Sequence, residues 1–176
     1  MITGKHIAET AVNSGLIGKP YSQYDCQALV EKVLELSGLH IINYRGSNHM
    51  WRDLVYDRGS LKTYFPPLGS LAFIVRNDGG EVKRGYHDDM GNATHVAIVL
   101  DDETVFESTT GGVQYGKLSR FTDYGLIKDV SYDEGGGDNA GEGCSFDVNR
   151  LLELVRVLRD NVDGLEVYIR ENIRNS

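Results

Sequence analysis

The hydrophobic and polar positions of this chain change their period near Pro66. Before that point, apolar residues recur at the spacing of amphipathic helices. After it, short segments rich in Val, Ile and Phe are separated by turn residues, which is typical of strands. Helices first and strands second predict an α+β domain, with N-terminal helices packed on an antiparallel sheet. The strands expected are 70–75, 94–100 and 104–109, with weaker signals at 113–118 and 125–130.

Three helices are expected before the strands. The first spans residues 4–14. The second begins after Asp25 and ends at Gly38, because glycine commonly terminates helices. The third begins at Ser47, whose hydroxyl is expected to cap it, and carries an apolar face as far as Val55.

A polar, glycine-bearing loop is expected at residues 77–92. Two interpretations stay open: the loop forms part of a cleft wall, or it is simply solvated. Its His87-Asp88-Asp89 segment carries residue types that ligate metals, but no further ligand accompanies it at a suitable spacing. We therefore read the segment as solvated and expect no metal and no cofactor.

The C-terminal part differs in composition from the rest. Residues 133–146 are rich in glycine and are expected to form a flexible linker between a domain at 1–132 and a helical tail at 147–176. The apolar residues of the tail have the alternating spacing of a coiled-coil seam, which favours self-association. The alternative is a helix folded back on its own domain, and Asp163-Gly164 would break the helix. The seam consists of Leu151, Val155, Leu158, Val162, Leu165 and Ile169.

Composition and charge limit the classes of function. A chain of 176 residues with 40% hydrophobic and 25% charged residues fits one soluble domain with an appendage. No apolar run is long enough to cross a membrane, and the N-terminus lacks the pattern of a secretory signal, so we expect a chain that is cytoplasmic as synthesised. The net charge of −8 argues against a nucleic-acid partner. The two cysteines are far apart and indicate neither a disulfide framework nor a zinc site.

Cys26 lies at or just inside the start of the second helix. The unpaired N–H groups and the dipole at a helix N-terminus favour an anion, and the thiolate is the nucleophilic form of cysteine. The alternative is a buried structural cysteine, which is common. Position alone leaves both interpretations open.

A cysteine nucleophile needs a base, and His95 is the best-placed histidine because it opens the most strand-like segment of the chain. Glu107 lies on the next strand. With a three-residue loop at 101–103, Glu107 is a diagonal neighbour of His95 on the same face of the sheet. With a two-residue loop the parity is reversed, and Ser108 takes that face instead.

Together these segments resemble the NlpC-type cell-wall cysteine peptidases, a branch of the papain-like fold. The family segment Pro-Tyr … Asp-Cys-Ser-Gly-Leu-Val is similar to Pro20-Tyr21 and Tyr24-Asp25-Cys26-Gln27-Ala28-Leu29-Val30. The match follows the order of the family over roughly residues 5 to 130. Further similar segments are Arg45-Gly46-Ser47, Leu68-Gly69-Ser70-Leu71-Ala72-Phe73, His95-Val96-Ala97-Ile98-Val99-Leu100 and Val105-Phe106-Glu107-Ser108.

The resemblance implies a role for each residue that matches the pattern. Cys26 would be the nucleophile, His95 the base and Glu107 the residue that orients it. Tyr21 would help to line the oxyanion site, and Asp25 would bind a free amine of the substrate. Gln27 replaces a serine that also contacts the amine end of the substrate in the family, so this position is expected to bind substrate.

The resemblance implies a hydrolase of peptidoglycan stem peptides, cleaving the bond between a D-γ-glutamyl residue and a diamino acid. A phage or prophage lysin, or a virion-associated wall hydrolase, fits a chain that lacks a signal peptide. A thiol-dependent amidase or acyltransferase of the same fold is the alternative enzyme. A structural or binding module without activity is the non-enzymatic alternative.

Overall fold

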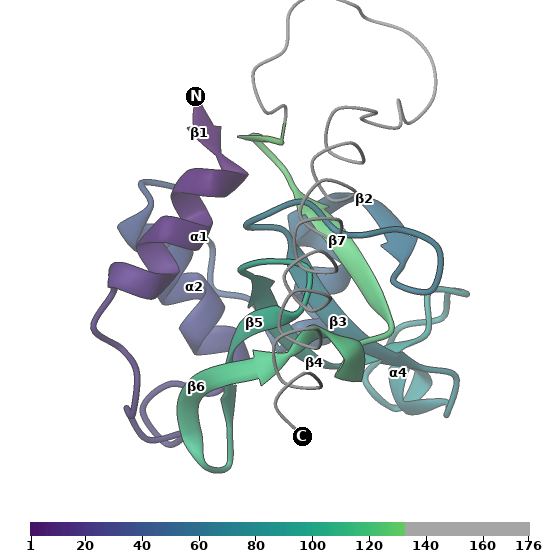
Figure 1. The fold of residues 1–176 in the computed structure, drawn as a ribbon. Coiled ribbons are helices and arrows are strands. Elements are labelled where there is room, and N and C mark those ends of the chain that lie inside the picture. The colour runs from purple at the N-terminus through teal and green to yellow at the C-terminus, as the bar shows by residue number, and fades with distance from the viewer. Residues whose placement is uncertain (133–176) are drawn as a thin grey trace, which may run out of the picture. The chain divides into compact units, whose positions relative to one another are not determined.

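The structure, a computed structural model, describes residues 1–132 (Figure 1). The linker predicted at 133–146 and the helical tail predicted at 147–176, with its coiled-coil seam and self-association, lie outside the described residues. None of the helices in the described part of the chain has the length and the apolar character needed to cross a bilayer.

The centre of the fold is a six-stranded sheet in which all neighbouring strands are antiparallel, in the order β2-β7-β3-β4-β5-β6. A separate two-stranded parallel sheet joins β1 to β8. The antiparallel sheet predicted from the sequence is confirmed, and three strands were not predicted: β2, which belongs to this sheet, and β1 and β8, which do not. The strands are β1 Ile2–Thr3, β2 Val55–Ser60, β3 Leu71–Arg76, β4 Asn92–Val99, β5 Thr104–Thr109, β6 Gly112–Lys117, β7 Asp123–Ile127 and β8 Val130–Ser131.

Two N-terminal helices, α1 (Gly4–Asn13) and α2 (Cys26–Leu36), lie next to each other at one side of the sheet (Figure 1). Helix α2 buries its apolar side, and its last turn is closed by Gly38, which has φ of 87°. The N–H of the next residue, Leu39, then donates to the carbonyl of Leu34 at 3.0 Å. Glycine adopts this left-handed conformation without strain, so the helix ends where the sequence predicts.

The third predicted helix takes a different form. A short α3 (Ser47–His49) continues into a π-helix, η1 (Met50–Leu54), and Val55 is already the first residue of β2. Ser47 is not the N-cap. Gly46 occupies that position, and the Ser47 hydroxyl donates to the Ala93 carbonyl at 2.6 Å. The wide turn is stabilised from β2, because the Arg58 guanidinium donates to the carbonyls at the end of η1.

The two faces of the sheet carry separate apolar layers. On the face covered by α1 and α2, here called the helix face, the sheet buries residues such as Phe73, Val96 and Phe106. The other face, here called the second face, has a smaller layer. A short 3₁₀ helix, η2 (Leu118–Arg120), contributes to it. The buried residues of this layer are Ala72, Ala97, Val99, Val105, Leu118 and Phe121.

A bulge separates the beginning of β4 from the rest of the strand. Val75 pairs with Ala93 and Ile74 pairs with His95, so Thr94 has no partner in the ladder. Ala93 therefore packs in the helix-face layer, although it lies two residues before His95. The side chain of Asn48 fixes the bulge, since its Oδ1 accepts from the N–H of Ala93 at 2.7 Å.

The loop at 77–92, which contains the short α4 (Gly80–Lys83), is docked on η1. Arg52 donates to both carboxylate oxygens of Asp88, at 2.6 and 2.7 Å, and its guanidinium lies 4.2 Å from the centre of the Tyr86 ring. The indole N–H of Trp51 donates to the carbonyl of Met90 at 2.9 Å. These contacts hold the loop against the helix that precedes β2, so Asp88 is engaged in an ion pair.

Candidate active site

Cys26 is the first residue of α2 and carries a free, half-buried thiol. The helix begins here because Asp25 caps it: Oδ1 of Asp25 accepts from the N–H of Ala28 at 2.8 Å. Aspartate is among the strongest N-cap residues, and its charge also interacts favourably with the helix dipole. The cap fixes the thiol at the position predicted from the helical pattern.

The N-terminal end of α2 reaches the sheet at a point where two strands separate. Strands β4 and β5 pair only at Ile98 with Phe106 and at Val99 with Val105. Beyond these pairs the Ser108 hydroxyl donates to the backbone carbonyl of Tyr24. Helix α2 contacts both β4 and β5. The separation of the strands thus brings the segment before Cys26 against β5.

His95 and Glu107 face each other across this opening. The N–H of Leu100 donates to the carbonyl of Thr104 at 2.9 Å, which is the register with the three-residue loop. In this register both side chains lie on the same face, and Nε2 of His95 is 2.8 Å from Oε2 of Glu107. The His95 side chain is 15% exposed and that of Glu107 is fully buried, at 0%. The other imidazole nitrogen, Nδ1, is left for Cys26.

The charges of the three groups are coupled. Burial by itself would lower the pKa of His95, but hydrogen bonds to Cys26 and Glu107, together with their negative charge, outweigh it and raise the pKa to about 9. Burial would raise the pKa of Glu107, but the hydrogen bond to His95 and the charge of Arg120 hold it below its ordinary value. At neutral pH the imidazole is therefore protonated and the carboxylate ionised.

We expect the imidazole of His95 to titrate near pH 9, well above the ordinary value of 6.5. Its contribution to the free energy of unfolding is fully present below pH 6.5 and is lost as pH rises through 9. The contribution of Glu107 has the opposite sign: it is present above pH 4.5 and is lost at lower pH. The titration of the His95 ring nitrogens by ¹⁵N NMR, assigned with a His95→Ala variant, checks this expectation. A midpoint near 6.5 would contradict it.

Three further residues surround the His95–Glu107 pair, and they were not predicted from the sequence. Nη1 of Arg120 donates to Oε1 of Glu107 at 2.7 Å. The ring of Phe121 stacks on His95, with 5.6 Å between ring centres. Gly116 leaves the space that the carboxylate fills, because a Cβ there would lie 2.1 Å from Oε1 of Glu107. In the sequence, Gly116 was the available sign of this contact, because a glycine inside a strand often marks a position that another group approaches closely.

Tyr21 lies beside the thiol. Its hydroxyl oxygen accepts from the N–H of Cys26 and also hydrogen bonds to the thiol. Burial, and then the charges of Cys26 and Asp25, raise the pKa of Tyr21, so the phenol stays protonated. The preceding segment is tied to β6, where Val113 donates to the carbonyl of Lys19 at 2.9 Å. The structure thus places the hydroxyl of Tyr21 beside the thiol, and its role as an oxyanion donor stays a prediction.

Asp25 and Gln27 flank the thiol in sequence but differ in their surroundings. The Asp25 side chain is exposed, so a ligand can reach it. Gln27 is engaged within the protein: Nε2 donates to the Tyr44 carbonyl at 2.5 Å and Oε1 accepts from the N–H of Gly46. The amide therefore holds the loop after α2 against the helix, a role that the sequence did not predict. Substrate binding by Gln27 stays a prediction.

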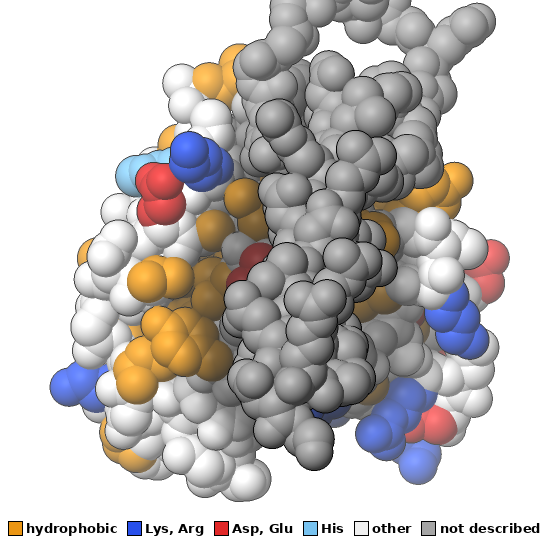
Figure 2. Space-filling model, viewed as in Figure 1, with side chains coloured by type: hydrophobic (Ala, Val, Ile, Leu, Met, Phe, Trp, Pro, Cys, Tyr) orange, Lys and Arg blue, Asp and Glu red, His pale blue; other side chains and the backbone are white. Residues whose placement is uncertain are grey.

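The surface around the site has an apolar part. Figure 2 shows apolar side chains gathered over the region where α2 and β6 lie in Figure 1. Tyr21, before α2, is 38% exposed, and Tyr115, on β6, is 51% exposed. The aromatic side chains at this end of the sheet are therefore accessible to a ligand.

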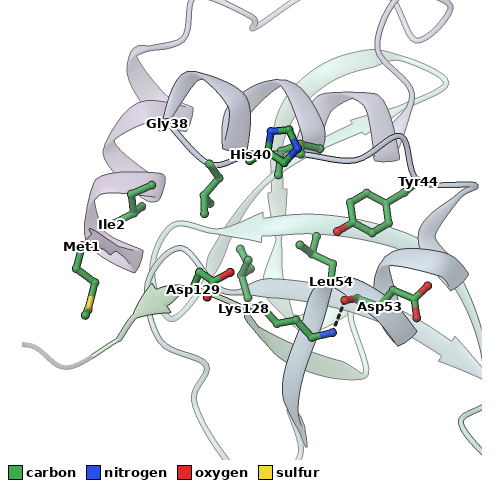
Figure 3. Close-up of a pocket in the computed structure, with 12 residues that line it drawn as sticks. Met1, Ile2, Gly38, His40, Tyr44, Asp53, Leu54, Lys128 and Asp129 are labelled. Carbon is green, nitrogen blue, oxygen red and sulfur yellow. Dashed lines mark hydrogen bonds between the residues drawn. The ribbon is translucent and has the colours of Figure 1, made fainter.

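A cavity of about 430 Å³ lies away from these residues, between the loop after α2 and the segment after β7 (Figure 3). Its wall includes Tyr44, and Nζ of Lys128 donates to the Asp53 carbonyl at 2.6 Å at its edge. None of the six predicted site residues lines it. Within residues 1–132, no group of three or more His, Cys, Asp and Glu side chains is placed to hold a metal ion.

Comparison with known proteins finds solved structures with a similar fold. No protein-family model matches the sequence, and no curated protein matches it. Among solved structures, the NlpC/p60 domain of the peptidoglycan hydrolase SagA is similar, with a TM-score of 0.51 and 20% identity over 72% of this chain and 100% of that one. A Staphylococcus aureus subsp. aureus Mu50 protein described as similar to lipoprotein, NLP/P60 family, gives a TM-score of 0.46 and 16% identity over 72% of this chain and 42% of that one.

The chain thus has the fold of an NlpC/p60 domain. This confirms the α+β fold, with N-terminal helices on an antiparallel sheet, that the sequence resemblance implies. The cysteine, histidine and carboxylate lie together on that fold.

Proposed function

We propose that this protein is a cysteine hydrolase that cleaves amide bonds in peptidoglycan stem peptides. The observation that supports this most strongly is the hydrogen-bonded series Cys26, His95 and Glu107 at a helix N-terminus. A nucleophile, a base and a group that orients the base are what acyl transfer by a thiol requires. The similar SagA domain comes from a peptidoglycan hydrolase, which directs the proposal to this substrate.

In the proposed reaction the Cys26 thiolate attacks the amide carbonyl and forms a tetrahedral intermediate. The protonated His95 gives its proton to the leaving amine, and the C–N bond breaks to leave a thioester on Cys26. His95 then accepts a proton from water, which attacks the thioester and releases the acid and the free thiolate. The hydroxyl of Tyr21, which lies beside the thiol, would donate to the oxyanion.

The bond proposed is the one between the D-γ-glutamyl residue and the diamino acid. The exposed carboxylate of Asp25 is adjacent to the nucleophile and would bind the free amine of a trimmed stem peptide. A carboxylate next to a thiolate is unfavourable on its own, and a cationic group on the substrate would offset this repulsion while Asp25 also caps the helix.

Mass spectrometry of peptidoglycan fragments, after digestion with the purified protein and with a Cys26→Ala variant, tests the proposal. We expect fragments that end at the D-glutamyl residue, each carrying one added water, from the unmodified protein only. Fragments that carry another acyl acceptor in place of water would indicate an acyltransferase. An unchanged polymer would indicate a binding module.

An Asp25→Asn substitution is expected to weaken binding of amine-bearing substrates selectively. Asparagine caps helices as well as aspartate does, so the start of α2 and the thermal stability should be retained. Removal of the charge should raise KM for a peptide with a free N-terminal amine by about tenfold, because a charge-assisted hydrogen bond is lost. Steady-state kinetics with matched free and N-acetylated peptides measures this. An equal loss on both would show that Asp25 serves only the helix.

A further inference from the structure

The buried carboxylate of Glu107 is held from three elements. Oε2 faces Nε2 of His95 on β4 at 2.8 Å, and Oε1 accepts from Nη1 of Arg120 in η2 at 2.7 Å. The side chain of Gln114 on β6 also hydrogen bonds to it. A fully buried carboxylate is stable as an ion only when such partners replace water. Each oxygen has a different charged partner, and this fixes the rotation of the carboxylate group.

Arg120 is presented by a segment that is anchored on both sides of it. Leu118 and Phe121 are 5% and 6% exposed and belong to the apolar layer of the second face. The N–H of Leu118 also donates to the carbonyl of Glu103 at 2.7 Å. The Arg120 side chain itself is 49% exposed. The backbone of η2 is thus fixed by buried neighbours, while the guanidinium reaches Glu107 from the solvent side.

The same segment contacts both members of the pair. Arg120 binds Glu107, and the next residue, Phe121, stacks on His95 with 28° between the ring planes. The stacked ring limits the tilt of the imidazole, and the guanidinium limits the rotation of the carboxylate. A productive geometry needs both groups to keep one orientation.

We propose that Arg120 is a positioning residue for the reaction: its guanidinium keeps Glu107 ionised and keeps Oε2 directed at His95. The expected effect of Arg120 on hydrolysis rests on the proposed function, whereas its effect on the ionisation and orientation of Glu107 does not. Arg120 contacts the carboxylate directly and His95 only across it, so its attraction for Glu107 outweighs its repulsion of the imidazolium. Without it, burial favours a protonated Glu107, and His95 loses its charged partner.

An Arg120→Gln variant, with Arg120→Lys as the conservative change, tests this. We expect Glu107 to titrate at higher pH in the glutamine variant, as measured by ¹³C NMR of its carboxyl carbon. The acidic limb of the pH profile of kcat/KM should move to higher pH as well. We also expect kcat to fall by about tenfold, which is a part of the rate enhancement that general acid–base catalysis supplies. The lysine variant keeps the charge and should retain most of both. The matched control is Lys117→Gln, which removes one positive charge from an exposed side chain on β6 and should change neither.

An unchanged Glu107 titration in Arg120→Gln would overturn the inference, whatever the activity. A shifted titration in a protein that does not cleave peptidoglycan would support the inference and overturn the proposed function. If the glutamine variant does not unfold cooperatively, Arg120→Met, which keeps the apolar part of the side chain, takes its place in the same titration.

Discussion

Cys26→Ala and His95→Ala are each expected to abolish muropeptide cleavage, with kcat/KM falling by at least about a thousandfold. Removal of the thiol removes the group that forms the acyl-enzyme. Removal of the imidazole removes the proton donor for the leaving amine and the positive charge beside the thiolate. The double variant should be no worse than either single variant, because the two groups act as one unit.

The measurement is the release of soluble fragments from purified peptidoglycan, followed by liquid chromatography. Circular dichroism and thermal unfolding establish that the variants keep the fold. Cys26 and His95 are only partly buried, so we expect their truncation to leave the core intact. Normal turnover by either variant would exclude the mechanism proposed here.

Glu107→Gln is the second substitution with a large expected effect. It keeps the size of the side chain but removes the charge that holds the protonated His95, so kcat should fall by about 10²- to 10⁴-fold. The basic limb of the pH profile, expected near pH 9 from the His95 titration, should move to lower pH. A fall in activity without movement of the limb would mean that Glu107 orients the imidazole but does not hold its positive charge.

Truncation of Ser108 is not a suitable control for Glu107→Gln. Ser108, its neighbour, is fully buried and donates to the carbonyl of Tyr24, so its truncation also disturbs the segment before the nucleophile. Glu103→Gln is the better match, because it makes the same chemical change in an exposed side chain of the same hairpin. Gly116→Ala offers an independent route, since the added methyl group would displace the Glu107 carboxylate without altering its charge.

The positions of Cys26 and His95 could be predicted because each depends on local pattern: a helical period with a capping residue for the cysteine, and strand alternation for the histidine. Whether Glu107 or Ser108 faces His95 depends on the register of the hairpin, which the strand pattern alone does not decide. The structure shows what decides it: Oδ1 of Asp101 accepts from the N–H of Glu103 and of Thr104, at 2.9 and 2.6 Å. An aspartate at the first position of a loop is a signal for this turn.

Other features were not predictable because they depend on distant contacts. Strand β2 has a largely polar sequence and forms because β7 pairs with it. The change from α-helix to π-helix at Met50 has no periodic signal, and Arg58 supports it from the next strand. Arg120 lies in a three-residue 3₁₀ helix, which is too short to show a period. Its partner, Glu107, becomes a neighbour only when the sheet is formed.

The bulge at Thr94 has a consequence for how this domain can vary in length. The bulge shifts the phase of β4 by one residue, so that Ala93 faces the helices and His95 faces the other way. Deleting Thr94 would remove the extra residue and leave a regular strand, in which Ala93 and His95, then adjacent, still face opposite sides. The loop at 77–92 lies just before this point, and insertions there would leave the phase intact. A change of one residue at Thr94 or in the loop therefore leaves the base in the site, whereas a one-residue deletion between His95 and Ile98 would turn the imidazole to the other face relative to β5.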